Sequence, residues 1–224
     1  MATHLDLEEQ EQLDQLKSFW KQYGNLITWL LIVVLAAYAA WNGWNWWQRE
    51  QAVKAGAMYD ELDRAAQAGD ADKAGRVFAD MKDRFPRTAF TEQGALLAAR
   101  TQFEKGQIDT ARATLTWVSE NAPEVEYQTI ARLRLAGVLL DEKKYDEALK
   151  QLDAAKGQEF EALVADRRGD ILLAQGKRDE ARAAYATAWK TMDASVDYRR
   201  LIDAKLTALG APPEPTAAVA EAGK

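Results

Sequence analysis

The sequence of 224 residues contains no cysteine and one histidine, His4. Without cysteine the chain has no disulfide, no thiolate ligand or nucleophile, and no thiol that could carry a lipoprotein anchor. A single histidine in an acidic N-terminal stretch does not supply the several ligands that a metal site requires. We therefore predict no metal-binding residues and no cofactor.

Charged residues are absent from positions 22–48, a run bracketed by Lys21 and Arg49. Its apolar centre, residues 26–47, would form a helix of about 33 Å at ~1.5 Å per residue, which is enough to cross a hydrocarbon layer of ~30 Å. Tryptophans lie near both ends of this stretch, where aromatic rings favour the headgroup level. The run predicts a transmembrane helix over 24–48.

Two alternatives to a permanent anchor remain open. Ala37-Tyr38-Ala39 fits the small-x-small pattern of a signal-peptide cleavage site, although the stretch before the apolar run is long and net acidic, and apolar residues continue beyond the site. The second alternative is a core helix of a soluble domain. Such a helix rarely lacks charge over so many consecutive positions, because one face normally meets water.

Basic residues barely distinguish the two sides of this span. Two lysines and the N-terminal amine precede it, and three basic residues follow it before position 65, so the positive charge expected on the cytoplasmic side is almost balanced. Lys21 adjoins the span and slightly favours a cytoplasmic N-terminus. We expect an acidic cytoplasmic tail over 1–23.

Four ten-residue segments repeat across the rest of the chain. They are GDADKAGRVF from Gly69, GQIDTARATL from Gly106, KKYDEALKQL from Lys143 and GKRDEARAAY from Gly176, spaced by 37, 37 and 33 residues. Periods of this length are typical of stacked helical hairpins. We predict an all-α protein in which a single N-terminal transmembrane helix precedes an α-solenoid of about four helical hairpins over 49–209.

The shared columns of the repeats have a physical interpretation. The first position is a turn residue expected to take a positive φ, and the fourth is an aspartate that could cap the next helix and complement its dipole. The sixth is a small residue that lets helices approach, and the tenth fills the space between hairpins. These columns are Gly69, Gly106, Lys143 and Gly176; Asp72, Asp109, Asp146 and Asp179; Ala74, Ala111, Ala148 and Ala181; and Phe78, Leu115, Leu152 and Tyr185.

The ends of the repeat elements are also marked. Pro86 and Pro123 are expected to stop the second helices of repeats one and two. Phe103 belongs to the apolar pattern of the first helix of repeat two, and the first helix of repeat one is predicted to continue from the membrane span. Residues 194–209 are predicted to form a closing helix, and the proline-rich stretch after it predicts a disordered tail over 210–224.

Catalytic motifs are missing from the sequence. It holds no Ser-His-Asp set, no phosphate-binding loop and no metal-ligand spacing, so we expect neither catalytic nor cofactor-binding residues and no enzyme. Residues 49–209 carry 26 basic and 28 acidic side chains, a balance that argues against a nucleic-acid partner.

The concave surface of a hairpin stack suits peptide or protein segments instead. The densest charged cluster, Asp166, Arg167, Arg168 and Asp170, could form surface ion pairs or a polar patch in that groove that contacts a partner. Six aromatic residues could either supply contacts there or fill gaps between helices. They are Trp117, Tyr127, Tyr145, Tyr185, Trp189 and Tyr198.

KKYDEALKQL and GKRDEARAAY resemble the Gly-x-Tyr-Asp-Glu-Ala core of the tetratricopeptide repeat. Three further stretches carry a more specific resemblance: LKSFWKQYGN from Leu16, GWNWWQ from Gly43 and VADRRGDILLAQGKRDEARAAY from Val164. Together they are similar to the YfgM family of ancillary SecYEG translocon subunits of Gram-negative bacteria, over roughly residues 10–209. Asn45 departs from the basic residue expected in the second stretch.

The resemblance implies a short cytoplasmic tail, one inner-membrane helix and a periplasmic repeat domain. It implies partnership with the SecYEG translocon and a PpiD-like membrane-anchored chaperone, with unfolded or newly translocated proteins as clients that are passed to periplasmic chaperones. The alternative is a membrane-tethered repeat scaffold for another envelope assembly, such as outer-membrane protein insertion or cell division.

Overall fold

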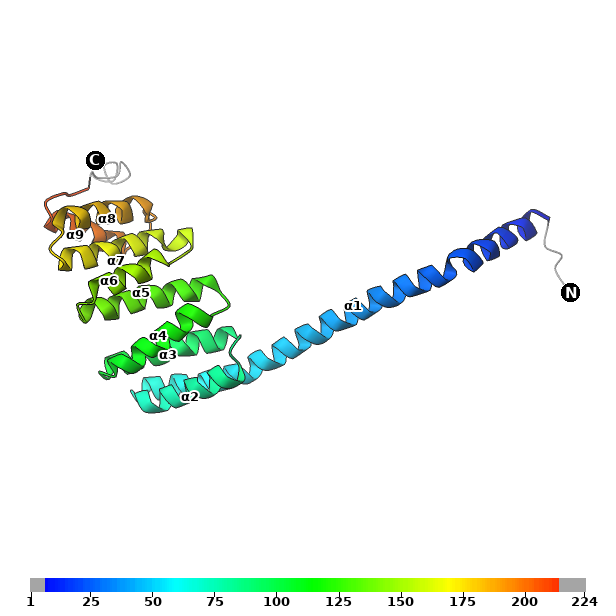
Figure 1. The fold of residues 1–224 in the computed structure, drawn as a ribbon, viewed down its shortest axis with the longest axis horizontal. Coiled ribbons are helices and arrows are strands. Elements are labelled where there is room, and N and C mark those ends of the chain that lie inside the picture. Colours follow the sequence, from blue (N-terminus) through cyan, green and yellow to red (C-terminus); the bar gives the residue numbers. More distant parts are fainter. Residues whose placement is uncertain (1–6, 214–224) are drawn as a thin grey trace, which may run out of the picture. The chain divides into compact units, whose positions relative to one another are not determined.

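The computed structural model describes residues 7–213, and this range contains helices and no strand (Figure 1). The predicted all-α class is confirmed. His4 and most of the predicted disordered tail lie outside the described residues. The helices are α1 (Leu7–Gln67), α2 (Ala71–Arg84), α3 (Ala89–Glu104), α4 (Ile108–Asn121), α5 (Val125–Asp141), α6 (Tyr145–Asp153), a 3-10 turn η1 (Gln158–Phe160), α7 (Glu161–Ala174), α8 (Arg178–Thr191) and α9 (Arg199–Ala208).

The first compact unit ends at Val53 and is built from the N-terminal part of α1. Within the described part of the chain, α1 is the one helix long and apolar enough to cross a membrane. Its large apolar side chains are exposed; Leu30, for example, keeps 61% of its surface and Trp41 68%. This exposure contradicts the alternative of a soluble core helix, because such a helix would bury these side chains against other elements.

The helix runs through Ala37-Tyr38-Ala39 without interruption. A helix of this kind is also what a signal sequence would form before cleavage, so the cleavage alternative stays open. The boundaries expected at 23, 48 and 209 likewise remain predictions.

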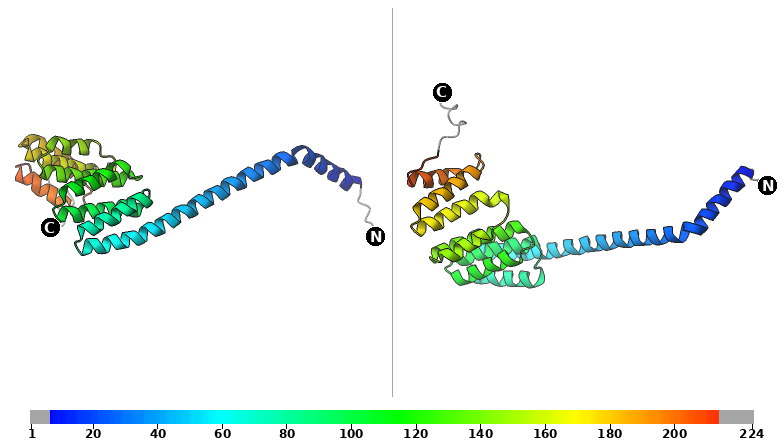
Figure 2. Two further views of the ribbon diagram at one scale, coloured as in Figure 1. Left: turned by 60° about the horizontal axis from the view of Figure 1, so that its bottom comes forward. Right: turned by 45° about the horizontal axis from the view of Figure 1, so that its top comes forward.

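The second compact unit begins at Lys54 and stacks four helical hairpins in chain order (Figure 1 and Figure 2). The last turns of α1 pair with α2, since Leu62 lies in one core cluster with Val77 and Met81. Helices α3 and α4, α5 and α6, and α7 and α8 form the other three pairs, and α9 packs on α8. The predicted four-hairpin array is confirmed, and so is the continuation of the membrane helix into its first hairpin.

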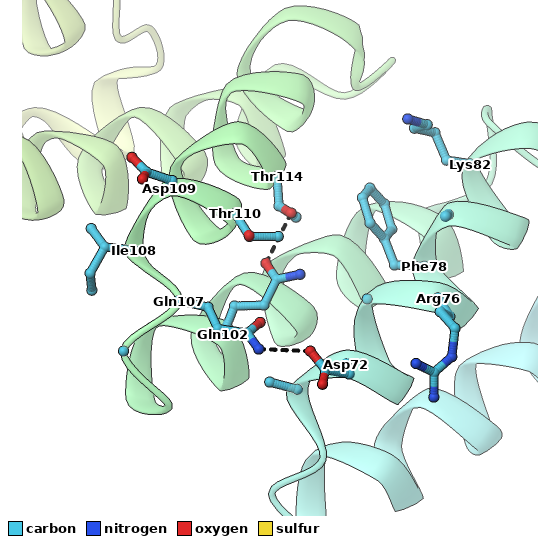
Figure 3. Close-up of a pocket in the computed structure, with 14 residues that line it drawn as sticks. Asp72, Arg76, Phe78, Lys82, Gln102, Gln107, Ile108, Asp109, Thr110 and Thr114 are labelled. Carbon is cyan, nitrogen blue, oxygen red and sulfur yellow. Dashed lines mark hydrogen bonds between the residues drawn. The ribbon is translucent and has the colours of Figure 1, made fainter.

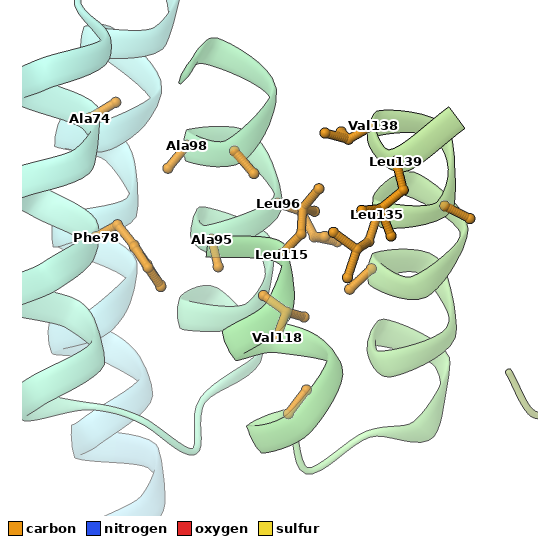
Figure 4. Packing of buried hydrophobic residues seen from close by; sticks show 14 of the residues in the cluster. Ala74, Phe78, Ala95, Leu96, Ala98, Leu115, Val118, Leu135, Val138 and Leu139 are labelled. Atoms are coloured by element: carbon orange, nitrogen blue, oxygen red, sulfur yellow. The ribbon is translucent and has the colours of Figure 1, made fainter. Parts of the chain in front are cut away.

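The small and large columns of the repeat form the core. All four column alanines are fully buried, and the four large residues of the tenth column keep at most 6% of their surface. Figure 4 shows Leu96, Leu115 and Leu135 meeting where α3, α4 and α5 come together. Small side chains let the helices approach, and large ones fill the space that remains, so each hairpin is stabilised by its neighbours.

The turn before each second helix takes the left-handed conformation that the first column predicts. Gly69, Gly106 and Gly176 have φ values of 67°, 77° and 80°, and Lys143 has a φ of 60°. The predicted helix stops are also confirmed, because α2 and α4 each end two residues before a proline, Pro86 and Pro123. The repeats therefore use one turn geometry even where a side chain makes it costly.

Replacing Lys143 with glycine should stabilise the repeat domain by about 0.5–1 kcal/mol. A left-handed residue with a Cβ costs about 1–2 kcal/mol, and glycine returns part of that gain through its freedom in the unfolded chain. Gly106→Ala is the matched opposite: its Cβ would meet no atom within 4 Å, yet its positive φ should make it destabilising by about 1 kcal/mol. Urea unfolding followed by circular dichroism measures both, and destabilisation by Lys143→Gly would contradict the argument.

The capping role predicted for the fourth-column aspartates is wrong. Helices α2, α4, α6 and α8 begin one residue before them, so each aspartate lies in the first helical turn rather than at the cap. Only α2 has a side-chain cap among these four: Asp70 accepts a hydrogen bond from the Lys73 backbone N–H at 2.9 Å. Their place in the first turn agrees with the other half of the prediction, that they complement the helix dipole.

The closing helix is shorter than the predicted 194–209. It is α9, Arg199–Ala208, because Asp193 holds the preceding segment in a turn by accepting hydrogen bonds from the backbone N–H and the hydroxyl of Ser195 at 2.8 and 2.7 Å. Such a local side-chain bond offers the backbone an alternative to the helix. Ile202 and Leu206 of α9 are buried, whereas Leu201 remains exposed.

Candidate functional site: a groove along the first helices

The first helices of successive hairpins, α3, α5 and α7, line a groove with a volume of about 330 Å³. Helix α3 contributes Arg100 and Phe103, α5 contributes Arg134 and Val138, and α7 contributes Arg167. Leu115 of α4 adds one more apolar side chain to the lining. We call this the arginine groove. It lies on helices that different repeats contribute, as expected for the peptide-binding surface of a hairpin stack.

The three arginines differ in their partners. Arg100 donates to Glu104 at 2.8 Å in an exposed pair, and Arg167 donates to Asp170 at 3.4 Å. Arg134 donates to the backbone carbonyl of Leu96 at 3.1 Å, and no carboxylate in residues 11–213 forms an ion pair with it. Burial first, and the like charge of Arg100 second, lower the pKa of Arg134 from its ordinary value. The groove thus holds an excess of positive charge.

A second hollow of about 760 Å³ lies between α2 and α4 (Figure 3). Its polar side chains bond to one another: Gln107 Nε2 donates to Asp72 at 2.7 Å, and the Thr114 hydroxyl donates to Gln102 Oε1 at 3.0 Å. The first bond joins α2 to the turn of repeat two, and the second joins α3 and α4 within repeat two. The hollow is therefore better explained as a polar contact between hairpins than as a ligand site.

The charged cluster of α7 divides into two parts: Arg168 forms a surface ion pair with Asp153, as one predicted alternative has it, whereas Asp166 and Asp170 belong to a buried polar network. Asp166 keeps 2% of its surface. Its two carboxylate oxygens lie 2.8 and 2.9 Å from Lys205 Nζ, and one of them accepts a bond from the Tyr198 hydroxyl at 2.8 Å. Asp170 accepts from Lys205 at 2.7 Å and from the Tyr185 hydroxyl at 2.8 Å. The sequence could not reveal this, because Lys205 and Tyr198 lie more than 30 residues away.

The two tyrosines respond to the network. Burial, followed by the hydrogen bond and negative charge of Asp170, raises the pKa of Tyr185 far above its ordinary value. Burial and the bond to Asp166 raise the pKa of Tyr198 in the same way. Both hydroxyls therefore stay protonated and donate to the carboxylates, so the network joins α7, α8 and α9. Of the original cluster, only Arg167 reaches the groove.

None of the six aromatic residues chosen from the sequence lines the arginine groove. Trp117 packs edge-on against Phe78 with ring centroids 5.4 Å apart, and Tyr185 is buried. The guanidinium carbon of Arg199 lies 4.1 Å from the centroid of the Trp189 ring. The alternative that they fill gaps between helices describes these three. The aromatic residue of the groove is Phe103, which keeps 38% of its surface and was assigned to the apolar pattern.

Arg100 and Arg134 were not predicted, because the repeat columns lie on the second helices, whereas Arg167 was named in the charged cluster. Arg134 and Arg167 are 33 residues apart, the spacing of repeats three and four, and this recurrence was the available signal. Within the described residues no group of three or more histidine, cysteine or acidic side chains could hold a metal ion. The expected absence of catalytic and cofactor-binding residues remains a prediction.

Comparison with known proteins adds family evidence to this geometry. The sequence pattern of a family described as "Tetratricopeptide repeat-like domain" matches residues 17–211. A protein of Neisseria gonorrhoeae named "Ancillary SecYEG translocon subunit" is 32% identical over 210 residues, which cover 93% of this chain and all of the relative.

Two further relatives carry the same name. The Haemophilus influenzae protein is 29% identical over 81% of this chain and 89% of its own length, and the Escherichia coli protein is 29% identical over 82% and 88%. The match spans the apolar helix as well as the repeats, so it covers both parts of the architecture. The chain therefore belongs to the tetratricopeptide repeat-like YfgM family, whose named members are ancillary SecYEG translocon subunits.

Proposed function

We propose that this protein is a single-pass inner-membrane subunit that assists the SecYEG translocon. Its α1 helix anchors it, its N-terminus faces the cytoplasm, and its repeat domain lies in the periplasm. There it helps to hand newly translocated proteins to periplasmic chaperones, with a PpiD-like membrane-anchored chaperone as partner. In this role the protein binds other proteins and catalyses no reaction.

One observation carries the proposal: the similarity to the named Neisseria relative extends over that protein's entire length. The structure supports it in two ways. The first unit exposes an apolar helix that suits a bilayer, and the second offers a groove on stacked hairpins. An anchored groove keeps a binding site within reach of a chain that emerges at the same membrane, so its effective concentration there is high.

Photo-crosslinking in intact cells tests the translocon partnership. A photoreactive amino acid at Leu31 or Val34, both exposed on α1, should give adducts with translocon subunits. The same group at Arg87, an exposed position of the repeat domain, is the control for nonspecific capture. If α1 yields only lipid and self adducts, the proposal loses its support. Adducts with outer-membrane insertion or division components would favour the scaffold alternative instead.

The same cells test orientation and anchoring. Because the chain has no cysteine, Gln15→Cys and Lys190→Cys can be labelled one at a time without background. An impermeant maleimide should reach position 190 after the outer membrane is opened, and position 15 only after the inner membrane is disrupted. Labelling at position 15 in intact spheroplasts would reverse the orientation. A mature chain that begins near residue 40 would show cleavage after Ala39.

A further inference from the structure

We propose that the arginine groove selects peptide segments in which an acidic side chain lies next to a large apolar one. The inference rests on the proposed client-binding role and assigns it a chemical preference. It begins from the position of Arg134 on α5, the middle of the three first helices that line the groove; Arg100 of α3 and Arg167 of α7 also line it.

The charge of Arg134 calls for an acidic partner. Its bond to the Leu96 carbonyl uses one guanidinium nitrogen at 3.1 Å, and no ion pair to a carboxylate in residues 11–213 neutralises it. Arg134 is an exposed residue beside the apolar groove walls, so its guanidinium is open to an entering carboxylate, which could form short, two-pronged hydrogen bonds with it. Focusing of the field in a cleft with apolar walls adds to the attraction.

The neighbouring arginines strengthen rather than cancel this preference. Arg100 pairs with Glu104 in an exposed contact, in which the two side chains keep 69% and 54% of their surface, and such pairs contribute little and exchange easily. Arg167 shares Asp170 with Lys205 and Tyr185, which bind that carboxylate at 2.7 and 2.8 Å, closer than Arg167 at 3.4 Å. Asp141, on the groove wall, pairs with none of the three.

The apolar walls of the groove account for the preference for a large apolar side chain next to the acidic one. Phe103 keeps 38% of its surface, and Val138 and Leu115 lie beside it in the groove. Gly137 leaves the wall of α5 without a side chain, and a Cβ there would lie 3.8 Å from the Arg167 guanidinium carbon. This opening lets an apolar side chain reach the groove while the adjacent carboxylate meets Arg134.

A nucleic acid fits these features poorly, because the repeat domain has nearly equal numbers of basic and acidic residues and the groove itself offers only three arginines. A bilayer surface fits poorly as well, since the arginines line a recess instead of a flat face. A peptide segment, extended or helical, can present one carboxylate and one apolar side chain to a recess of this size.

Fluorescence anisotropy with the full-length protein in detergent micelles tests the preference. The probes are two fluorescein-labelled twelve-residue peptides that carry leucine and phenylalanine, one with three aspartates beside them and the other with asparagines at the same places. The acidic peptide should bind about tenfold more tightly at low salt. The difference should shrink in 0.5 M salt, because the Debye length falls to a few ångströms. Equal binding of the two peptides would overturn the inference.

Variants locate the site. Arg134→Gln should remove the preference for the acidic peptide, whereas Arg200→Gln, at an exposed arginine of α9, should leave it intact. Gly137→Leu should weaken both peptides by filling the groove, and Arg134→Glu should shift the preference to a lysine peptide. A preference that survives Arg134→Gln would overturn the assignment. Loss of translocon crosslinks from α1 would instead count against the proposed function, so the two failures are distinguishable.

Discussion

Replacing Asp166 with asparagine should destabilise the repeat domain by about 2–3 kcal/mol. The substitution keeps the size of the side chain but removes a buried charge that Lys205 contacts at 2.8 and 2.9 Å. Removal of one partner from a buried pair leaves the other without compensation, which typically costs about 3–5 kcal/mol. We expect less here because Lys205 retains Asp170 at 2.7 Å. Urea unfolding followed by the helical circular dichroism signal measures the loss.

Asp153→Asn is the matched control for this substitution. Asp153 also forms an ion pair, with Arg168 at 2.6 Å, but it keeps 62% of its side-chain surface. Loss of this exposed pair should change stability by less than about 0.5 kcal/mol. Equal effects of the two substitutions would show that burial does not decide the energy of these pairs. Combining Asp166→Asn with Lys205→Met should cost less than the two single changes added together, since each removes the same contact.

The damage from Asp166→Asn should be local. Lys205 and Tyr198 reach Asp166 from α9 and the residue before it, and each hairpin of a stacked array is stabilised mainly by its neighbours. Hydrogen exchange should therefore show lost protection in α8 and α9, with α3 and α5 unchanged. Loss of protection spread evenly over all hairpins would contradict a network that holds only the last hairpin.

Glu92→Gln should stabilise the protein by about 3 kcal/mol at pH 8 and by less than about 1 kcal/mol at pH 5. Glu92 keeps 1% of its surface. One carboxylate oxygen accepts from the Glu124 backbone N–H at 3.4 Å, and the other has no hydrogen-bond partner among the described residues. Burial, with Glu124 and Glu126 as further causes, raises the pKa of Glu92 to about 7.

The direction of the pH dependence follows from this shift. The folded state holds the Glu92 proton more tightly than the unfolded chain, whose pKa is near the ordinary value of 4.5. The folded state is thus favoured fully below about pH 4.5, and this contribution is lost as the pH rises through about 7. Glutamine remains uncharged throughout, so the variant avoids the loss. One pKa unit corresponds to about 1.4 kcal/mol.

Denaturant unfolding of the parent and the variant at several pH values checks this expectation. Subtracting the two curves removes the contribution of every other titrating group. Glu120→Gln, at an exposed position of α4, is the control and should change stability by less than about 0.5 kcal/mol at either pH. A constant difference between Glu92→Gln and the parent from pH 5 to pH 8 would refute a buried, protonated Glu92.

The features that the sequence predicted correctly depend on local patterns, and those that it did not predict depend on tertiary contacts. The helical hairpins, their turns and their buried alanines followed from residues within ten positions of one another. The capping role of the fourth-column aspartates was wrong because they lie two residues after the N-cap positions, and a cap and a first-turn residue look alike in sequence. The closing helix was overextended because a single Asp193 turn competes with it.

The residues of the candidate site were harder to predict from the sequence than the fold. The six aromatic residues were chosen as groove contacts or gap fillers, and the groove proved to carry arginines and Phe103. Asp166 and Asp170 were placed on the surface, whereas they accept bonds from α8 and α9 and the segment before α9. Both outcomes depend on contacts between distant helices, because an aromatic or charged residue on a helix has the same sequence signature whether or not a distant helix covers it.

The sequence by itself determined the apolar span, the repeat period and the all-α hairpin stack. The span and each helix depend on residues close together in the chain, and the period on a similar segment that recurs every 33–37 residues. Only the tertiary structure decided which side chains of different hairpins meet. Arg100, Arg134 and Arg167 converge because α3, α5 and α7 lie along one groove, and Asp166 is buried because α9 packs over it. These outcomes depend on how the hairpins stack, and the resulting burial sets the energies of the charges involved.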